Sequence, residues 1–118
     1  MDAQELQRNL KQFTGTEGYT RHTHKVVLTD GVLYLAENAA CYWLLDLFAS
    51  YLHYISNEEF TCLKLVRENQ SATVTIDDGN GNVLATQFVE YTDFVLETLT
   101  LYGCWTGEYW VVMLTGEY

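Results

Sequence analysis

The sequence contains no proline and has no basic residue after Arg67. Globular proteins contain on average about 5% proline, but its absence here points to no particular function. The lack of bases is more informative, because residues 68–118 hold eight acidic residues and therefore have a net charge of −8. Residues 1–67 hold eight acids and six bases, a net of −2. Direct binding to DNA or RNA is disfavoured, since it depends on Lys and Arg side chains that displace counterions from phosphates.

Cysteine is also scarce, and the three that occur, Cys41, Cys62 and Cys104, are widely separated. An odd number at this spacing matches neither a disulfide framework nor a zinc site. Cysteine is among the residue types most often simply buried. We therefore expect reduced thiols and predict no cofactor and no metal.

Long uncharged apolar runs are missing as well. No stretch approaches the roughly 20 apolar residues that cross a bilayer, and the start, MDAQELQRNLKQF, lacks the apolar segment of a secretory signal. We expect a cytoplasmic protein without a membrane partner. A chain of 118 residues is long enough for one domain, residues 1–118, with its own hydrophobic core.

The most strongly patterned stretch, Asp30 to Ile55, predicts one long central helix. Apolar side chains recur close to one line at the helical period, and Thr29 or Asp30 can cap the first turn. Apolar residues also occur on the opposite side, so the helix should be covered on more than one side. The buried stripe is expected to contain Leu33, Ala40, Leu44, Leu47, Phe48, Tyr51 and Ile55.

Shorter elements flank this helix. Residues 2–13 have the spacing of a short amphipathic helix, and residues 15–24, rich in Gly and Thr, predict a loop. Asp78–Gly81 predicts a tight turn, because Asp, Asn and Gly tolerate positive φ; Ile76 would then pair with Val83 or Leu84. Strands are expected at residues 25–29, 60–66, 71–77, 82–91, 98–104 and 108–115.

This order of elements predicts an α+β fold. The long central helix and the short N-terminal helix should pack on one face of an antiparallel meander sheet of about five to six strands.

Three groups of residues could belong to a catalytic or metal site, but for each a purely structural role is favoured. Asp46, Ser50 and His53 share a helix face, but Asp46 and His53 would be about 10.5 Å apart along the axis, and a serine in mid-helix lacks the exposed turn and oxyanion donors of a hydrolase. We therefore predict no catalytic residue and expect these three to lie on a solvated or interface face.

His22 and His24 have the i, i+2 spacing that directs two imidazoles to one side of a strand. A metal site would need a third ligand, and Arg21 and Lys25 would repel the cation. Glu37 lies near the apolar stripe, where burial could raise its pKa, but a lone acid makes no active site. We expect it near the start of the helix or paired with Arg21 or Lys25.

The acidic second half is also rich in aromatic residues. In the strand around Tyr109 and Trp110 both faces are apolar, so the strand is either covered twice or contacts a partner. Tyr and Trp are enriched at interface hot spots, and acidic side chains would attract a basic protein surface; the alternative is that the acidity serves solubility alone. The predicted partner-binding residues are Asp77, Asp78, Glu90, Asp93, Glu97, Glu108, Tyr109 and Trp110.

Four stretches, FTGTEGYTRH, TDGVLYLAENAACYWLLDLFAS, SATVTIDDGNGNV and YTDFVLETLTLY, resemble a family of small bacterial, plasmid and phage proteins known only as a domain of unknown function. The resemblance spans nearly the whole chain. The family has proline where Val95 stands here, a departure that bears only on local turn shape. The resemblance to this family implies no activity, ligand or catalytic residue. An association with mobile elements would suit an inhibitor or an accessory of host nucleic-acid machinery, by analogy alone.

Three functions remain. The first is a non-enzymatic protein-binding module, in its sharpest form an inhibitor whose acidic half imitates nucleic acid towards a basic cleft of a host complex. The second is a small enzyme or ligand-binding domain with a pocket between helix and sheet, served by Glu37, His22 and His24. The third is a structural homo-oligomer, such as a homodimer, built on the aromatic strands.

Overall fold

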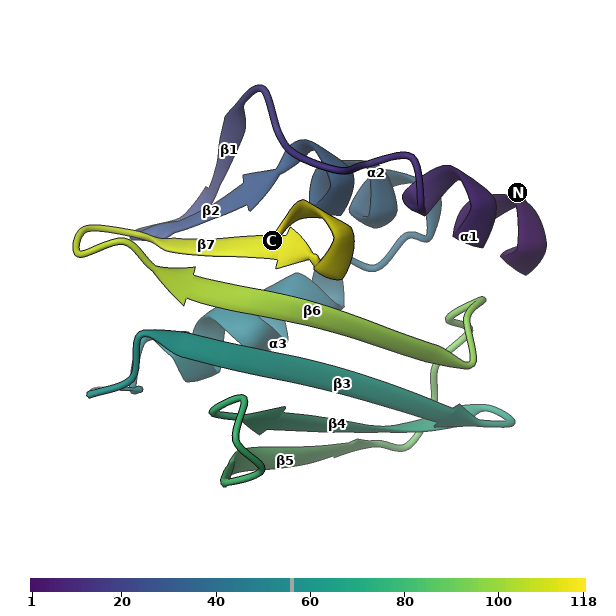
Figure 1. Ribbon diagram of the computed structural model, residues 1–118. Coiled ribbons are helices and arrows are strands. Elements are labelled where there is room, and N and C mark those ends of the chain that lie inside the picture. Colours follow the sequence, from purple (N-terminus) through teal and green to yellow (C-terminus); the bar gives the residue numbers. More distant parts are fainter. Residues whose placement is uncertain (56) are drawn as a thin grey trace.

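The computed structural model describes residues 1–55 and 57–118, and within them it shows an α+β fold built on a seven-stranded mixed sheet (Figure 1). The strand order is β1-β2-β7-β6-β3-β4-β5, and β2 and β7 form the one parallel pair among the described strands. The elements are α1 (Ala3–Leu10), β1 (Tyr19–Thr23), β2 (Val26–Thr29), α2 (Asp30–Asn38), α3 (Tyr42–Leu52), β3 (Phe60–Glu68), β4 (Ser71–Asp77), β5 (Val83–Val89), β6 (Thr98–Trp105), β7 (Trp110–Leu114) and the 3₁₀ turn η1 (Thr115–Glu117).

The α+β class is confirmed, but the predicted meander of five to six strands is wrong in two respects. β1 lies where a loop was expected, because its side chains are mostly exposed and give no apolar alternation. β7 does not continue outward from β6 at a free edge. It lies between β6 and β2 and pairs Val26 with Trp110 and Leu28 with Val112, a long-range contact that local patterns cannot indicate.

The prediction of a single central helix is also wrong, because the helix is interrupted between α2 and α3. Ala40 has a φ of +50°, a left-handed conformation that ends α2 and redirects the chain. After the break the apolar side chains follow a new phase, so Ala40 is exposed, and Leu44 and Phe48 are the only fully buried members of the predicted stripe. The residues buried along the two helices are Val32, Leu35, Ala36, Leu44, Leu45, Phe48, Ala49 and Leu52. No helix in the described parts of the chain has the length and apolarity needed to span a membrane.

The start of α2 is fixed by the C-terminus of the chain. Thr29 caps the helix, as predicted, by accepting from the Val32 N–H at 3.4 Å. The Glu117 carboxylate then accepts from the Thr29 hydroxyl at 2.6 Å and from the Gly31 N–H at 3.1 Å. A donor that would otherwise be free in the first turn of the helix is satisfied in this way, and η1 is held against α2.

The two helices cover one face of the sheet (Figure 1). Close packing of α3 depends on Gly103 in β6, where an added Cβ would lie 2.6 Å from Thr61 Oγ1 and 3.0 Å from Phe48 Cζ. Adjacent residues of a strand point to opposite faces, so Tyr102 lies on the other face. There its ring packs against those of Phe60, at 5.0 Å, and Tyr118, at 5.4 Å.

The tight turn at Asp78–Gly81 is confirmed, and its register differs from both alternatives expected. Ile76 pairs with Ala85 and Asp77 with Val83, which leaves Leu84 as an extra residue in a bulge. Because of this extra residue, the pairing register of β4 with β5 shifts by one residue between Ile76 and Asp77. Gly79 and Gly81 both have positive φ, as the composition of the turn requires.

Candidate partner-binding site

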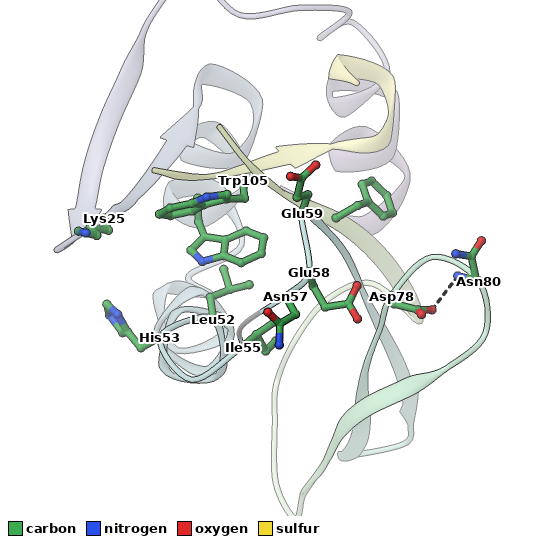
Figure 2. Close-up of a pocket in the computed structure, with 12 residues that line it drawn as sticks. Lys25, Leu52, His53, Ile55, Asn57, Glu58, Glu59, Asp78, Asn80 and Trp105 are labelled. Carbon is green, nitrogen blue, oxygen red and sulfur yellow. Dashed lines mark hydrogen bonds between the residues drawn. The ribbon is translucent and has the colours of Figure 1, made fainter. Parts of the chain in front are cut away.

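A pocket of about 810 Å³ lies at the end of the sheet where β3 begins and β6 ends (Figure 2). The connections around it come from separate parts of the chain: the β1–β2 turn, the end of α3, the segment before β3, and the β4–β5 turn. Its lining residues include Lys25, Leu52, His53, Ile55, Asn57, Glu58, Glu59, Phe60, Asp78, Asn80, Trp105 and Trp110.

Two indoles belong to the apolar lining of this pocket, together with Leu52, Ile55 and Phe60. Trp105 and Trp110 are cross-strand partners at the β6–β7 turn, and their ring centroids are 5.5 Å apart at an interplanar angle of 53°. The backbone amide of Trp105 donates to the Glu59 carbonyl oxygen at 2.8 Å, and the backbone amide of Trp110 donates to the Lys25 carbonyl oxygen at 2.7 Å. These backbone bonds attach both flanking segments to the strand pair, so the pocket is built on rigid elements.

Basic and acidic residues lie on opposite sides of Trp105. Figure 2 shows Lys25 and His53 on one side of Trp105, and Glu58, Glu59 and Asp78 on the other. Among these acids, Glu59 is attached to Trp105 through the backbone hydrogen bond described above.

Asp78 is held in place by its own turn. Its carboxylate accepts from Asn82 Nδ2 at 2.8 Å, from the Asn80 N–H at 2.9 Å and from the Asn82 N–H at 3.1 Å. These donors, with the Asn82 side chain foremost, lower the pKa of Asp78 below its ordinary value. The residue thus contributes a fixed negative charge to the rim, while much of its hydrogen-bonding capacity is used by the hairpin.

Two of the predicted partner-binding side chains are not accessible. Asp77 is only 6% exposed, lies 3.7 Å from Lys64 Nζ and accepts from the Gly79 N–H at 2.7 Å. A base from the first half of the chain therefore faces Asp77, although residues 68–118 contain none. Trp110 is 5% exposed and belongs to the core, so the interpretation of its strand as covered on both sides holds at this position.

Of the other predicted acids, Asp78 is half-buried and the remaining four are exposed, and the five lie at two ends of the sheet. Asp78 and Glu108 follow strand ends near the pocket, whereas Glu90, Asp93 and Glu97 lie in the β5–β6 connection at the opposite end. At about 3.3 Å per residue, strands of this length separate the two groups by roughly 25 Å. They therefore form two acidic regions and not one continuous field.

Tyr109 is half-buried, and the Arg21 guanidinium lies 5.9 Å from its ring centroid. This is the distance of a weak cation–π contact. The aromatic residues of the second half are thus not accompanied by acids alone, since β1 brings a base from the first half of the chain.

The residues considered for catalysis are not assembled into a triad. Asp46, Ser50 and His53 are exposed, and the Ser50 hydroxyl donates to Leu47 O within its own helix at 2.7 Å. Asp46 instead has an oxygen 2.8 Å from His22 Nε2, a close approach without the alignment of a hydrogen bond. His22 also stacks on Tyr42, with ring centroids 6.4 Å apart, so it joins β1 to α3.

Other candidates for chemistry are dispersed. Glu37 is exposed in the last turn of α2 and not near a helix start, and His24 is exposed beside the β1–β2 turn. Among the described residues, no three His, Cys, Asp or Glu side chains are grouped as metal ligands. Burial raises the pKa of Cys41 to about 12 and also raises the pKa of Cys62 and of Cys104. These free thiols are therefore poor nucleophiles at neutral pH.

Sequence reasoning missed Glu58 and Glu59, which line the pocket. They lie in a polar connection with no motif, and only the tertiary fold brings them to Trp105. Two adjacent acids just before an apolar strand were the available signal, but solvated charges at strand ends are common and such a signal has little specificity.

Comparison with curated proteins and with solved structures found no match to either. A family model does match residues 4–118, nearly the whole chain. Its description, Family of unknown function (DUF6876), assigns no activity that the pocket could be tested against. The match confirms a family of unknown function over nearly the whole chain and carries no evidence of a phage or plasmid origin, and the chain belongs to this family.

Proposed function

We propose that this chain is a small, acidic, non-enzymatic protein-binding module, and that its pocket receives a cationic side chain from a basic protein surface. The observation that carries the proposal is that Glu58 and Glu59 line the same cavity of about 810 Å³ as the Trp105 indole. An indole face attracts an ammonium or guanidinium group, and neighbouring carboxylates add directional charge-assisted hydrogen bonds.

The net charge of the chain supports a basic partner. At −10, long-range attraction would steer a positively charged surface towards the protein and raise the association rate. Lys25, on the other side of Trp105 from the acids, would repel a second cation, so the pocket favours one cationic side chain oriented towards the acids.

In its most specific form, the proposal is that the module inhibits a host protein complex by occupying a surface that otherwise binds nucleic acid. Carboxylates displayed around an aromatic pocket would then take the place of phosphates and bases. A chain carried by phages or plasmids would have a use for such an inhibitor, and this part of the proposal rests on the resemblance noted in the sequence.

A charge-reversal comparison tests the site. The double variant Glu58→Lys/Glu59→Lys changes the charge at the pocket, and Glu90→Lys/Asp93→Lys makes the same change at the opposite end of the sheet. Each variant is checked by circular dichroism, titrated with a lysine- and arginine-rich peptide while Trp fluorescence is followed, and used to capture partners from bacterial lysate.

The pocket variant should lose most peptide binding and capture, while the control should keep the greater part of both. Binding to the wild type should weaken as NaCl rises from about 0.05 M to about 0.5 M, because the Debye length falls. If the two variants lose binding equally, net charge alone is responsible and the pocket is not the site.

A further inference from the structure

The β4–β5 turn contains Asn80–Gly81, the one place in the sequence where a glycine follows an asparagine. Asparagine is among the thermolabile residue types. A following glycine has no side chain to shield its backbone nitrogen, which can then approach the carbon of the neighbouring side-chain amide. Both residues are exposed, and an added Cβ at Gly81 would meet no atom within 4 Å. Solvent therefore reaches both of these groups.

The turn is held by hydrogen bonds that leave this pair out. The backbone N–H groups of Asn80 and Asn82 donate to the Asp78 carboxylate at 2.9 Å and 3.1 Å. No described hydrogen bond involves the Gly81 N–H or the Asn80 side-chain amide. In Figure 2 the Asn80 side chain points away from Asp78, to which only its backbone is bonded. Within the described contacts, neither group has to break an interaction before it reacts.

We propose that Asn80 is a site of spontaneous deamidation, in which the Gly81 nitrogen attacks the side-chain carbon and water completes the reaction. The Gly81 N–H loses its proton to solvent base, a bond forms between this nitrogen and Asn80 Cγ, and the side-chain nitrogen takes up a proton and leaves as ammonia. The product is a cyclic succinimide. Water then adds to one of the two ring carbonyls and opens the ring, which yields aspartate or isoaspartate. Water is the only co-reactant.

The same turn holds two other candidate positions, and its hydrogen bonds protect both. Asp78 also precedes a glycine, but the Gly79 N–H donates to the Asp77 carboxylate at 2.7 Å. The hydrogen bonds that lower the pKa of Asp78 keep its carboxyl ionised, a form from which no oxygen leaves. Asn82 donates through its side-chain nitrogen to Asp78 at 2.8 Å and precedes Val83, whose stiff, branched side chain crowds the attacking nitrogen.

Deamidation would change the pocket described above. Asn80 lines the same cavity as Glu58 and Asp78, so the reaction adds a carboxylate there and makes the net charge of −10 more negative by one. A cationic side chain would then be bound more tightly. This consequence rests on the proposed function, whereas the modification itself does not.

The test follows the charge and mass of the full chain during incubation at neutral and at mildly alkaline pH. Isoelectric focusing should show a species with one more negative charge. Trypsin then releases residues 68–118 as one peptide, because no base follows Arg67, and fragmentation in a mass spectrometer should locate aspartate and isoaspartate at position 80. The rate should rise with pH, since the Gly81 nitrogen must lose its proton.

Two variants and an unfolded reference make the test specific. In Asn80→Gln a larger ring would have to close, which is far slower, so the acidic species should not form. Asn38→Gln is the same substitution at an exposed asparagine whose amide donates to Tyr34 O at 2.8 Å, and it should react like the wild type. Circular dichroism should show both variants folded. The folded wild type should react within about tenfold of the rate of the same chain unfolded in urea, a difference of about 1.4 kcal/mol in activation free energy.

Three results would overturn the proposal. A folded chain that keeps its charge while the unfolded chain deamidates would show that the hairpin protects Asn80. An acidic species that still forms in Asn80→Gln, or that maps to Asn82, would place the reaction elsewhere. Isoaspartate at position 78 would refute the selection made by the hydrogen bonds of the turn. Titration of the deamidated chain with the cationic peptide is judged separately: unchanged affinity after confirmed deamidation would count against the pocket and leave the modification standing.

Discussion

At the scale of single residues, the most constrained position is Gly31 in the first turn of α2. An added Cβ would lie 2.6 Å from both Glu117 Oε1 and Leu114 Cδ1, so Gly31→Ala must displace the Glu117 and Leu114 side chains, and with them the carboxylate that holds the C-terminal turn against the helix. We expect a loss of about 1–3 kcal/mol in the free energy of unfolding, measured by urea denaturation. Gly15→Ala is the control, because no atom lies within 4 Å of its added Cβ. Equal losses in both variants would contradict this account.

Asp78 provides a prediction about pH. Its hydrogen bonds to Asn82 and Asn80 lower its folded-state pKa, while the unfolded chain should titrate near the ordinary value of about 3.9. The carboxylate therefore stabilises the fold above the unfolded pKa, and this contribution is lost as the pH falls through the lower, folded pKa. Asp78→Asn removes the charge that these donors favour.

The stability difference between wild type and Asp78→Asn should be largest from neutral pH down to about pH 4 and should shrink at lower pH. Urea denaturation across this range measures it, with Asp93→Asn, an exposed acid with no such turn network among the described hydrogen bonds, as the control. A difference that grows on acidification would show that the pKa of Asp78 is raised and not lowered.

At the scale of elements, the break between α2 and α3 predicts the sign of the change in the free energy of unfolding when Ala40 is replaced by glycine. Ala40 has a φ of +50°, which costs an L-residue with a Cβ about 1–2 kcal/mol. Ala40→Gly should therefore increase the free energy of unfolding by about 1 kcal/mol. In a continuous helix the same change would decrease it by about 1 kcal/mol. Chemical denaturation distinguishes the two outcomes, and Ala39→Gly, at a φ of −108°, is the control that should not stabilise.

The elements that the sequence predicts well are those whose signals are local. The hairpin follows from Asp78–Gly81, whose residue types tolerate positive φ, and α1 follows from apolar spacing and the Asp2 cap, which accepts from the Glu5 N–H at 2.8 Å. The break at Ala40 could not be predicted, because alanine is the best helix former and its left-handed conformation is imposed by packing. β1 was missed because its residues are largely exposed.

The candidate site was less predictable than the fold. The acidic residues were recognised by type, but their separation into two groups depends on the pairing of β4 with β5 and of β3 with β6. Likewise, the pocket exists only because the parallel pairing of β2 with β7 brings Lys25 to the Trp110 end of the sheet. Contacts between residues so distant in sequence leave no periodic pattern.

At the scale of the whole molecule, the charge of −10 should itself oppose folding. The described residues form two ion pairs within 4 Å, His22 with Asp46 and Lys64 with Asp77, and the first requires a protonated imidazole. Most of the 16 acids therefore repel one another without a nearby base. Repulsion of this kind destabilises the compact state, and it acts over distances at which salt is effective.

Added salt should therefore raise the stability of the protein, which distinguishes it from a protein held together by surface ion pairs. The thermal midpoint should rise between about 0.02 M and about 0.5 M NaCl, over which the Debye length falls from roughly 20 Å to roughly 4 Å. The variant Glu90→Gln/Asp93→Asn removes two charges from one acidic region and should show a smaller rise. Measurements at low protein concentration, where any dimer dissociates, exclude a contribution from association. A midpoint that falls with salt would mean that the two ion pairs outweigh the repulsion among the acids, and the acidic regions would then lack the unbalanced field on which attraction of a basic partner depends.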